Sequence, residues 1–314
     1  MAAATLPVVL EAEGEPLAAW WERHRARCRR LLAEAGALLL RGFQADTLES
    51  FGRARELLLD RPGSYVEGAT PRDRLGEHVY TSTNFPAAEP IALHNENSYA
   101  MSWPGLLLFG CLQEPESGGA TPVADVRRVL QRLPVPLVDE FERRGGWLLR
   151  RTYSDWFGLG WQRAFGTTER AEVEKYCREA SVETEWQADG VLRTRQVRPV
   201  TARHPYTGER SWFNHVHFWH PSALGSETRE LLEEEYGPQG LPYATCYGDG
   251  TPIPDETVAR IRAAFDAETR ATPWRRGDLL LIDNMLVAHG RQPFTGDRRV
   301  VVAMGNPVER APAV

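Results

Sequence analysis

The stretch from Ile91 to Asp125 contains residues whose types and spacing suit metal chemistry. His94 and Glu96 lie two apart in an alternating segment. On a β-strand or its extended continuation this spacing points both side chains to one face. A second histidine, His289, lies far downstream between Asp283 and Arg299. Two histidines and one carboxylate form the facial triad that binds Fe(II) and leaves positions open for a co-substrate and oxygen. The sequence therefore predicts an iron site made of His94, Glu96 and His289.

Polar residues that would complete such a site follow both segments. The run from Gly105 to Leu112 is typical of a fully buried strand. The turn Ser117 to Thr121 comes next and would place a hydroxyl beside the metal. Downstream of the second histidine, Arg298 and Arg299 form an arginine pair.

These motifs together resemble the taurine dioxygenase-like superfamily of Fe(II)/2-oxoglutarate oxygenases. The segments HNE, GGATPVAD and AHGRQPFTGDRR have the order and approximate separation typical of that superfamily. TSTNFP, LHNENSY and WRRGDLLLIDNMLVAHGR resemble most closely its branch of syringomycin-type aspartyl hydroxylases. The resemblance extends from about Ala37 to Met304, with agreement in composition rather than motif between about Leu133 and Thr201.

The resemblance implies the fold and the co-substrates. We expect a mainly β protein with flanking helices, built on a double-stranded β-helix (jelly-roll) core. One domain is expected over residues 1–314, with a helical insertion at about residues 126–201. Hydrophobic periodicity alone predicts only a mixed α and β domain. The implied cofactors are Fe(II), the co-substrate 2-oxoglutarate and O2.

The distal carboxylate of 2-oxoglutarate requires a permanent, forked cation, which arginine supplies better than lysine. Arg298 or Arg299 should be that residue, and alternation along the last strand lets only one of them point inward. The resemblance favours Arg299. It also implies that Thr121 donates its hydroxyl to 2-oxoglutarate, although a turn-capping role is the alternative. Asn84 is a further candidate for binding this co-substrate.

Glu96 limits the reaction that the resemblance implies. Halogenases of the superfamily have a small residue in place of the carboxylate so that chloride can bind iron, whereas here the carboxylate is present. Hydroxylation is therefore favoured, with epoxidation and desaturation left open. The aspartate of taurine dioxygenase is replaced by glutamate, which disfavours a sulfonate substrate.

The branch points to an amino acid or related acyl substrate in a natural-product pathway, either free or tethered to an acidic carrier protein. Four residues are candidates for contacting it: Arg72, Asn97, Tyr99 and Asn214.

Two other classes of function use the same residues. A zinc hydrolase would activate water on the same triad but leaves Thr121 and the arginine pair without a role. A metal-free, cupin-like binding protein leaves the intact triad unexplained. The spacing of His215, His217 and His220 is also compatible with a second metal site, but no nearby carboxylate or thiol completes it.

The composition is that of a soluble enzyme, with 42% hydrophobic and 25% charged residues in 314. We expect a cytoplasmic protein, because no apolar run is long enough to span a membrane and the start lacks a signal-peptide pattern. The net charge of −6 argues against nucleic-acid binding. The oligomeric state is left open.

Two basic stretches are expected to be solvent-exposed, Arg23 to Arg30 as a helix face and Arg193 to Arg203 as a charged loop or edge strand. Carrier docking through electrostatic complementarity is the alternative. The four cysteines are scattered singly, which indicates buried, reduced thiols.

Periodicity and end signals predict several elements that would surround the site. They are a helix over residues 16–34 ended by Gly36, a strand over 37–43, a helix from Asp46 or Thr47 to about residue 60, irregular backbone over 61–90, a helix over 255–268 and a buried strand over 278–283.

Overall fold

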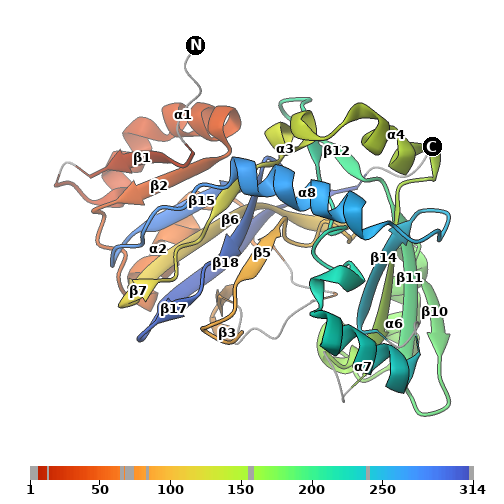
Figure 1. Ribbon diagram of the computed structural model, residues 1–314. Coiled ribbons are helices and arrows are strands. Elements are labelled where there is room, and N and C mark those ends of the chain that lie inside the picture. The colour runs from red at the N-terminus through yellow and green to blue at the C-terminus, as the bar shows by residue number, and fades with distance from the viewer. Residues whose placement is uncertain are drawn as a thin grey trace.

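The computed structural model describes residues 6–12, 14–63, 67, 74–82, 85–154, 159–237 and 241–310. Its largest element is a seven-stranded sheet in the order β1-β2-β15-β6-β18-β4-β3. The strands are β1 (Val8–Glu11), β2 (Ala37–Arg41), β15 (Leu279–Asp283), β6 (Ser102–Gln113), β18 (Arg299–Glu309), β4 (Val79–Thr81) and β3 (Arg74–Gly76). Figure 1 shows β1, β2, β15, β6 and β18 side by side, so segments from both ends of the sequence lie in one sheet.

Both faces of this sheet are buried at its centre, because alternate residues of β2, β15, β6 and β18 enter different hydrophobic clusters. On β15, Leu279 and Leu281 pack with the helices, whereas Leu280 and Ile282 pack in a second cluster on the opposite face. The predicted buried strand over 278–283 is confirmed.

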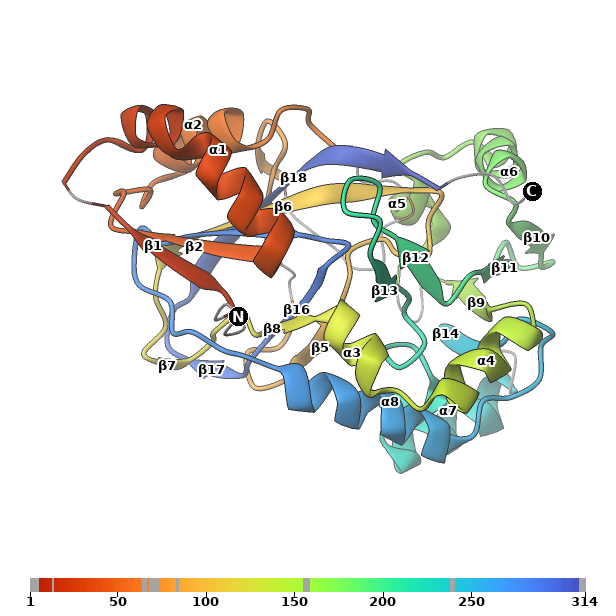
Figure 2. The same cartoon turned by 90° about the horizontal axis from the view of Figure 1, so that it is seen from above.

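Two helices cover one face of the sheet. Helix α1 (Leu17–Ala35) ends at Gly36, whose φ of 81° is left-handed and whose N–H donates to the carbonyl of Leu32. Helix α2 (Leu48–Leu58) begins after Thr47, whose side chain accepts a hydrogen bond from the main-chain N–H of Ser50. Both predicted helices are confirmed. Figure 2 shows α1 and α2 together on one side of the large sheet, with β5, β8 and β16 on the other.

The second layer consists of short strands on the face away from α1 and α2. A three-stranded sheet has the order β5-β16-β8, with β5 (Ile91–His94), β16 (Val287–Arg291) and β8 (Val123–Asp125). Beside it, β17 (Phe294–Thr295) pairs with β7 (Ser117–Gly118). Together the two layers form the jelly-roll core with flanking helices that the resemblance implied, so the predicted fold class is confirmed.

The segment at about residues 126–201, predicted as a helical insertion, contains both helices and strands. It contains the helices α3 (Val126–Arg132), α4 (Val135–Arg143), α5 (Trp161–Phe165) and α6 (Arg170–Glu179), and the strands β9 (Trp147–Tyr153), β10 (Glu183–Trp186) and β11 (Leu192–Arg198). With β14 (Tyr243–Tyr247) these strands form a four-stranded sheet in the order β10-β11-β9-β14. The helical prediction was wrong because charged residues alternate with buried ones along β11, which gives it a helix-like composition but a strand period.

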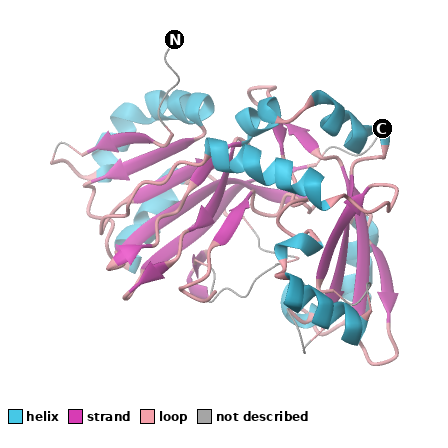
Figure 3. Cartoon of the chain, viewed as in Figure 1, coloured by secondary structure: helices cyan, strands magenta, loops and turns pink. Residues whose placement is uncertain are grey.

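Figure 3 shows this second group of strands set apart from the core sheets. Because β11 lies inside its sheet, the expectation of a loop or edge strand is wrong for Arg193 to Arg198, whereas Thr201–Arg203 does form an edge strand, in a two-stranded sheet. The backbone over residues 61–90 was expected to be irregular but includes β3 and β4.

The remaining elements connect the two groups of strands. They are β12 (Thr201–Arg203), β13 (Arg210–Trp212), the short 3₁₀ helix η1 (Pro221–Ala223), α7 (Ser226–Tyr236) and α8 (Asp255–Glu268). The predicted helix over 255–268 is confirmed. His215 and His217 were expected on a strand but lie in a turn, where Trp219 N donates to His215 O. Within the described part of the chain, no helix combines the length and apolar character needed to cross a bilayer.

All four cysteines are free and buried. Burial raises the pKa of Cys111 and of Cys177 to about 12, and it also raises the pKa of Cys28 and Cys246. Each unit lowers the thiolate fraction about tenfold. We therefore expect a thiol-specific disulfide reagent to modify none of them in the native protein at pH 8 and all four after denaturation. Rapid labelling of the native protein would contradict the burial.

Candidate active site

The three residues of the predicted triad converge in the structure. His94 ends β5 and pairs directly with His289 on β16, and Glu96 lies two residues beyond the end of β5. The potential ligand atoms of the three side chains all lie within 4.8 Å of one another. The two imidazole ring centroids are 4.5 Å apart. Antiparallel pairing of the two strands is what brings together residues so distant in sequence.

The surroundings orient these side chains. Nδ1 of His94 lies 2.9 Å from the carbonyl oxygen of Ala92, which makes Nε2 the ligating nitrogen. The ring of His289 packs against Phe109 at 5.1 Å, and that of His94 against Phe218 at 4.9 Å. Two imidazoles and one carboxylate suit a divalent first-row metal and leave coordination positions open. The donor set therefore fits iron.

A small cavity of about 30 Å³ adjoins the triad. Larger hollows of about 650 and 460 Å³ are lined by residues of α1 and α2, away from these histidines, so chemistry and not size identifies the site. The residues around the small cavity are Ser82, Ile91, His94, Phe109, Thr121, His289, Gly290, Arg291 and Arg298. Both imidazoles therefore face a space that is also lined by two hydroxyl and two guanidinium side chains.

Of the arginine pair, Arg298 is the one that faces this cavity. Its Nε donates to the carbonyl of Gly119 at 2.8 Å, and its guanidinium also donates to Ser82 Oγ at 3.2 Å. Arg299 is exposed. The expectation from the resemblance that Arg299 points inward is therefore wrong. Strand alternation agrees with Arg298, because Val300, Val302 and Met304 pack with Phe109, which lines the same cavity.

Arg291 lines the same cavity and was not anticipated. It donates to the carbonyls of Phe85 and Glu89 at 2.9 and 2.8 Å. Both arginines lie over the ring of Phe294, at 5.2 Å for Arg291 and 5.5 Å for Arg298. Arg291 could have been predicted as a cavity residue from the sequence, because it lies two residues after His289 and therefore on the same face of β16.

Arg291 and Arg298 together make one side of the cavity strongly cationic. Burial, with Arg291 close by, lowers the pKa of Arg298 to about 10, which still leaves it charged near neutrality. Among the described residues no carboxylate pairs with either guanidinium. Two partly desolvated cations of this kind favour an anionic ligand.

Thr121 lies at the cavity, where its hydroxyl oxygen accepts a hydrogen bond from Trp274 Nε1 at 3.1 Å. The hydroxyl keeps its own proton, so it remains able to donate. This partner lies on a distant segment and not within the SGGAT turn, which favours the binding role over the turn-capping alternative.

Asn97 and Tyr99 are buried directly behind Glu96, where the Tyr99 hydroxyl donates to Asn97 Oδ1 at 3.1 Å. Asn214 is used by the fold: its Nδ2 donates to Val200 O at 2.7 Å and its Oδ1 accepts from Val216 N at 2.9 Å. The role of Asn214 in substrate binding therefore stays a prediction. Arg72 and Asn84 lie outside the described residues.

The three histidines of the Ser211 to His220 stretch each bind a different partner. His215 Nδ1 lies 2.6 Å from Ser98 Oγ, and Nε2 of His217 and of His220 lies near the carbonyls of Leu93 and Ile253, at 2.9 and 3.0 Å. Burial lowers the pKa of all three, that of His217 to about 3. Among the described residues the triad is the one group able to hold a metal ion, which agrees with the argument against a second site.

A jelly-roll core that presents two imidazoles and one carboxylate to a single point is the architecture of non-haem, metal-dependent oxygenases. The chain belongs to the TauD/TfdA family: the family described as "Taurine catabolism dioxygenase TauD, TfdA family" matches residues 3–304. The predicted class, an Fe(II)- and 2-oxoglutarate-dependent dioxygenase, is thereby confirmed.

Two curated relatives and one solved structure illustrate the similarity. The dapdiamide synthesis protein DdaC of Enterobacter agglomerans is 42% identical over 278 residues, which are 88% of this chain and 84% of DdaC. A clavaminate synthase-like protein of Arabidopsis thaliana is 31% identical over 284 residues, covering 87% of this chain and 82% of that protein. PvcB of Pseudomonas aeruginosa shares the fold with a TM-score of 0.54 at 19% identity, covering 95% of this chain and 85% of that chain.

Proposed function

We propose that this enzyme hydroxylates an unactivated C–H bond of an amino acid or related acyl substrate in natural-product biosynthesis. The observation that carries the proposal is the convergence of His94, Glu96 and His289 beside a cavity that also contains Arg298. DdaC takes its name from dapdiamide synthesis, and PvcB is described as an Fe, alpha-ketoglutarate dependent oxygenase from an isonitrile synthetic pathway. We treat residues 1–314 as one oxygenase domain, located in the cytoplasm.

In the proposed mechanism His94, Glu96 and His289 would hold the metal, and a set of three protein ligands would leave coordination positions for other ligands. Arg298 pairs with the distal carboxylate of 2-oxoglutarate, and Arg291 adds positive charge on the same side. Thr121 donates its hydroxyl to the same co-substrate. When bound, the iron supplies the oxidising chemistry that converts 2-oxoglutarate and O2 to succinate and CO2 and inserts oxygen into the substrate. The protein contributes placement of the reactants and exclusion of water.

The carboxylate of Glu96 favours hydroxylation over halogenation, because it occupies the position that a halide would need. Epoxidation or desaturation of the same substrate is the alternative within the family. Asn97 and Tyr99 remain proposed contributors to the substrate side, since they follow Glu96 directly along the chain.

The basic stretch on α1 is poorly placed to dock a carrier protein at the triad. The exposed arginines of α1 lie on the helix-covered face of the large sheet, whereas β5 and β16 lie on the other face (Figure 2). In the second basic stretch, Arg198 is buried and its Nε donates to Tyr99 O at 2.8 Å. Reversing the charges of Arg25, Arg27 and Arg30 should therefore leave turnover unchanged, and a selective loss with a carrier-bound substrate would favour docking.

A spectroscopic experiment tests the proposed metal and co-substrate chemistry. Anaerobic addition of Fe(II) and then 2-oxoglutarate to the metal-free protein should produce a weak visible charge-transfer band, because the keto acid chelates the iron. Zn(II) in place of Fe(II) should give no band. Absence of the band with bound Fe(II), together with Zn(II)-dependent hydrolytic activity, would support the hydrolase alternative instead.

A further inference from the structure

Asn284 is a fully buried asparagine in the turn between β15 and β16, directly behind the triad. Its side chain brackets the peptide groups of Glu96. Oδ1 accepts from Glu96 N at 2.7 Å, and Nδ2 donates to Glu96 O at 2.9 Å. Nδ2 also donates to Pro104 O at 2.8 Å. One amide group therefore satisfies both main-chain polar groups of the predicted carboxylate ligand.

Glu96 needs such support because it lies beyond the end of β5. His94 and His289 are held by the pairing of β5 with β16, whereas Glu96 is not among the residues paired between these two strands. Its segment is instead tied to the turn, since Asn95 Nδ2 also donates to the main-chain carbonyl of Asn284 at 2.6 Å. The turn thus links the Glu96 segment to the hairpin that carries His289.

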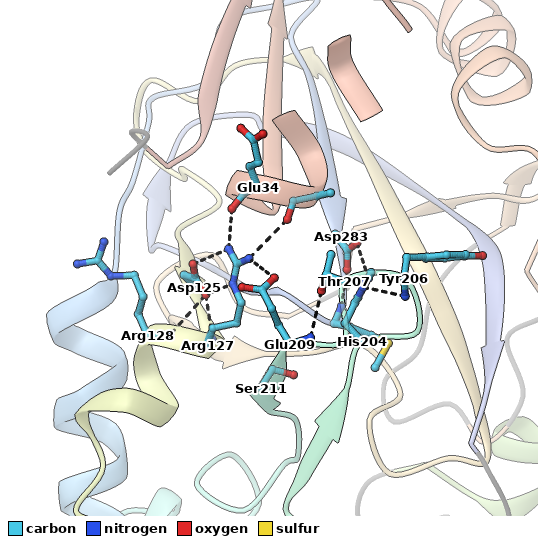
Figure 4. Close-up of polar contacts among 12 residues, drawn as sticks. Glu34, Asp125, Arg127, Arg128, His204, Tyr206, Thr207, Glu209, Ser211 and Asp283 are labelled. Atoms are coloured by element: carbon cyan, nitrogen blue, oxygen red, sulfur yellow. Dashed lines mark hydrogen bonds and ion pairs between the residues drawn. The ribbon is translucent and has the colours of Figure 1, made fainter. Parts of the chain in front are cut away.

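The turn itself has rigid supports. Asp283 Oδ1 accepts from Met285 N at 3.0 Å, and Asp283 Oδ2 lies 3.0 Å from His204 Nε2 in the β12–β13 hairpin. Figure 4 shows this His204 contact beside the cluster around Arg127, which binds Asp125, Glu209 and the carbonyl of Glu34. Leu286 O accepts from Val126 N at 2.9 Å. The turn is therefore fixed to several elements, and Asn284 transmits that rigidity to Glu96.

We infer that Asn284 is a positioning residue for the metal: its side chain holds the main chain of Glu96 so that the carboxylate meets the two imidazoles in ligating geometry. The inference rests on the proposed metal triad and goes beyond it. Partners behind a metal ligand typically contribute about 10–100-fold to metal affinity.

Co(II) is a suitable probe, because its visible absorption reports coordination geometry and its affinity can be measured by titration without turnover. With 2-oxoglutarate present and oxygen excluded, Asn284→Ala should weaken Co(II) binding about 10–100-fold and change the absorption spectrum. Asn284→Asp should also weaken binding, since it places a carboxylate oxygen against the carbonyls of Glu96 and Pro104.

A double-mutant cycle with Glu96→Ala separates positioning from a general loss of stability. If Asn284 acts through Glu96, then Asn284→Ala should change Co(II) affinity by less than about twofold in the Glu96→Ala background. If the two losses multiply within about twofold, the residues act independently and the inference is overturned.

Asn306→Ala is the matched control. Like Asn284, Asn306 accepts a hydrogen bond from a main-chain N–H with its Oδ1, in this case that of Arg61, and its own backbone is left-handed with φ of 54°, so its loss should lower the melting temperature. Co(II) affinity should stay unchanged. If Glu96→Ala binds Co(II) as tightly as the natural protein, the proposed metal site itself fails; if only Asn284→Ala is without effect, the positioning role alone fails.

Discussion

Replacing His94 or Glu96 by alanine is expected to abolish succinate formation coupled to substrate oxidation. Each change removes one of three donors that meet within 4.8 Å, and two donors hold a divalent ion weakly and without the facial geometry. Mutation of a residue that supports a metal ligand typically lowers metal affinity about 10–100-fold, and removal of a ligand itself should lower it more. Succinate and CO2 release, measured with Fe(II) and 2-oxoglutarate under air, check the activity, and titration of the metal checks the affinity.

His24→Ala is the matched control for these variants. His24 lies on α1, where its Nδ1 is 2.8 Å from the carbonyl of Trp20, far from the strands that carry the triad. It should keep both activity and metal affinity. Retention of coupled turnover by both His94→Ala and Glu96→Ala would refute the ligand assignment, whereas loss in the His24 variant would indicate a general effect of the substitution on folding.

Replacing Arg298 by alanine is expected to raise the concentration of 2-oxoglutarate needed for half-maximal turnover by about 30-fold or more. Loss of one partner from a buried, hydrogen-bonded charge pair costs about 2–5 kcal/mol. Arg298→Lys should recover only part of the loss, since an ammonium lacks the planar fork. The measurement is the dependence of succinate formation on 2-oxoglutarate, with binding confirmed by the charge-transfer band.

Arg299→Ala is the control within the same pair. Arg299 is exposed and outside the cavity, so its replacement should change the 2-oxoglutarate requirement by less than about threefold, as for an exposed charge. A steep rise for Arg299→Ala with no effect of Arg298→Ala would reverse the assignment. An effect of Arg291→Ala as large as that of Arg298→Ala would show that the two cations bind the co-substrate jointly.

The amino-acid sequence by itself determined those features that depend on near neighbours along the chain. The HNE motif predicted that His94 and Glu96 share one site, and the run of apolar residues before Asp283 predicted β15. Thr47 and Gly36 marked helix ends, because capping depends on the local backbone. The motifs read together also gave the family and its cofactors.

The tertiary structure decided features that depend on pairing between distant segments. Alternation allowed only one of Arg298 and Arg299 to point inward, and the packing of Val300 and Val302 beside Phe109 decided that it is Arg298 and leaves Arg299 exposed. The strands β9, β10 and β11 join β14 from far downstream, and no local pattern shows that partner. The contact of Asn284 with Glu96 is of the same kind. Each depends on which strands lie side by side, a property of the whole chain that neighbouring residues do not specify.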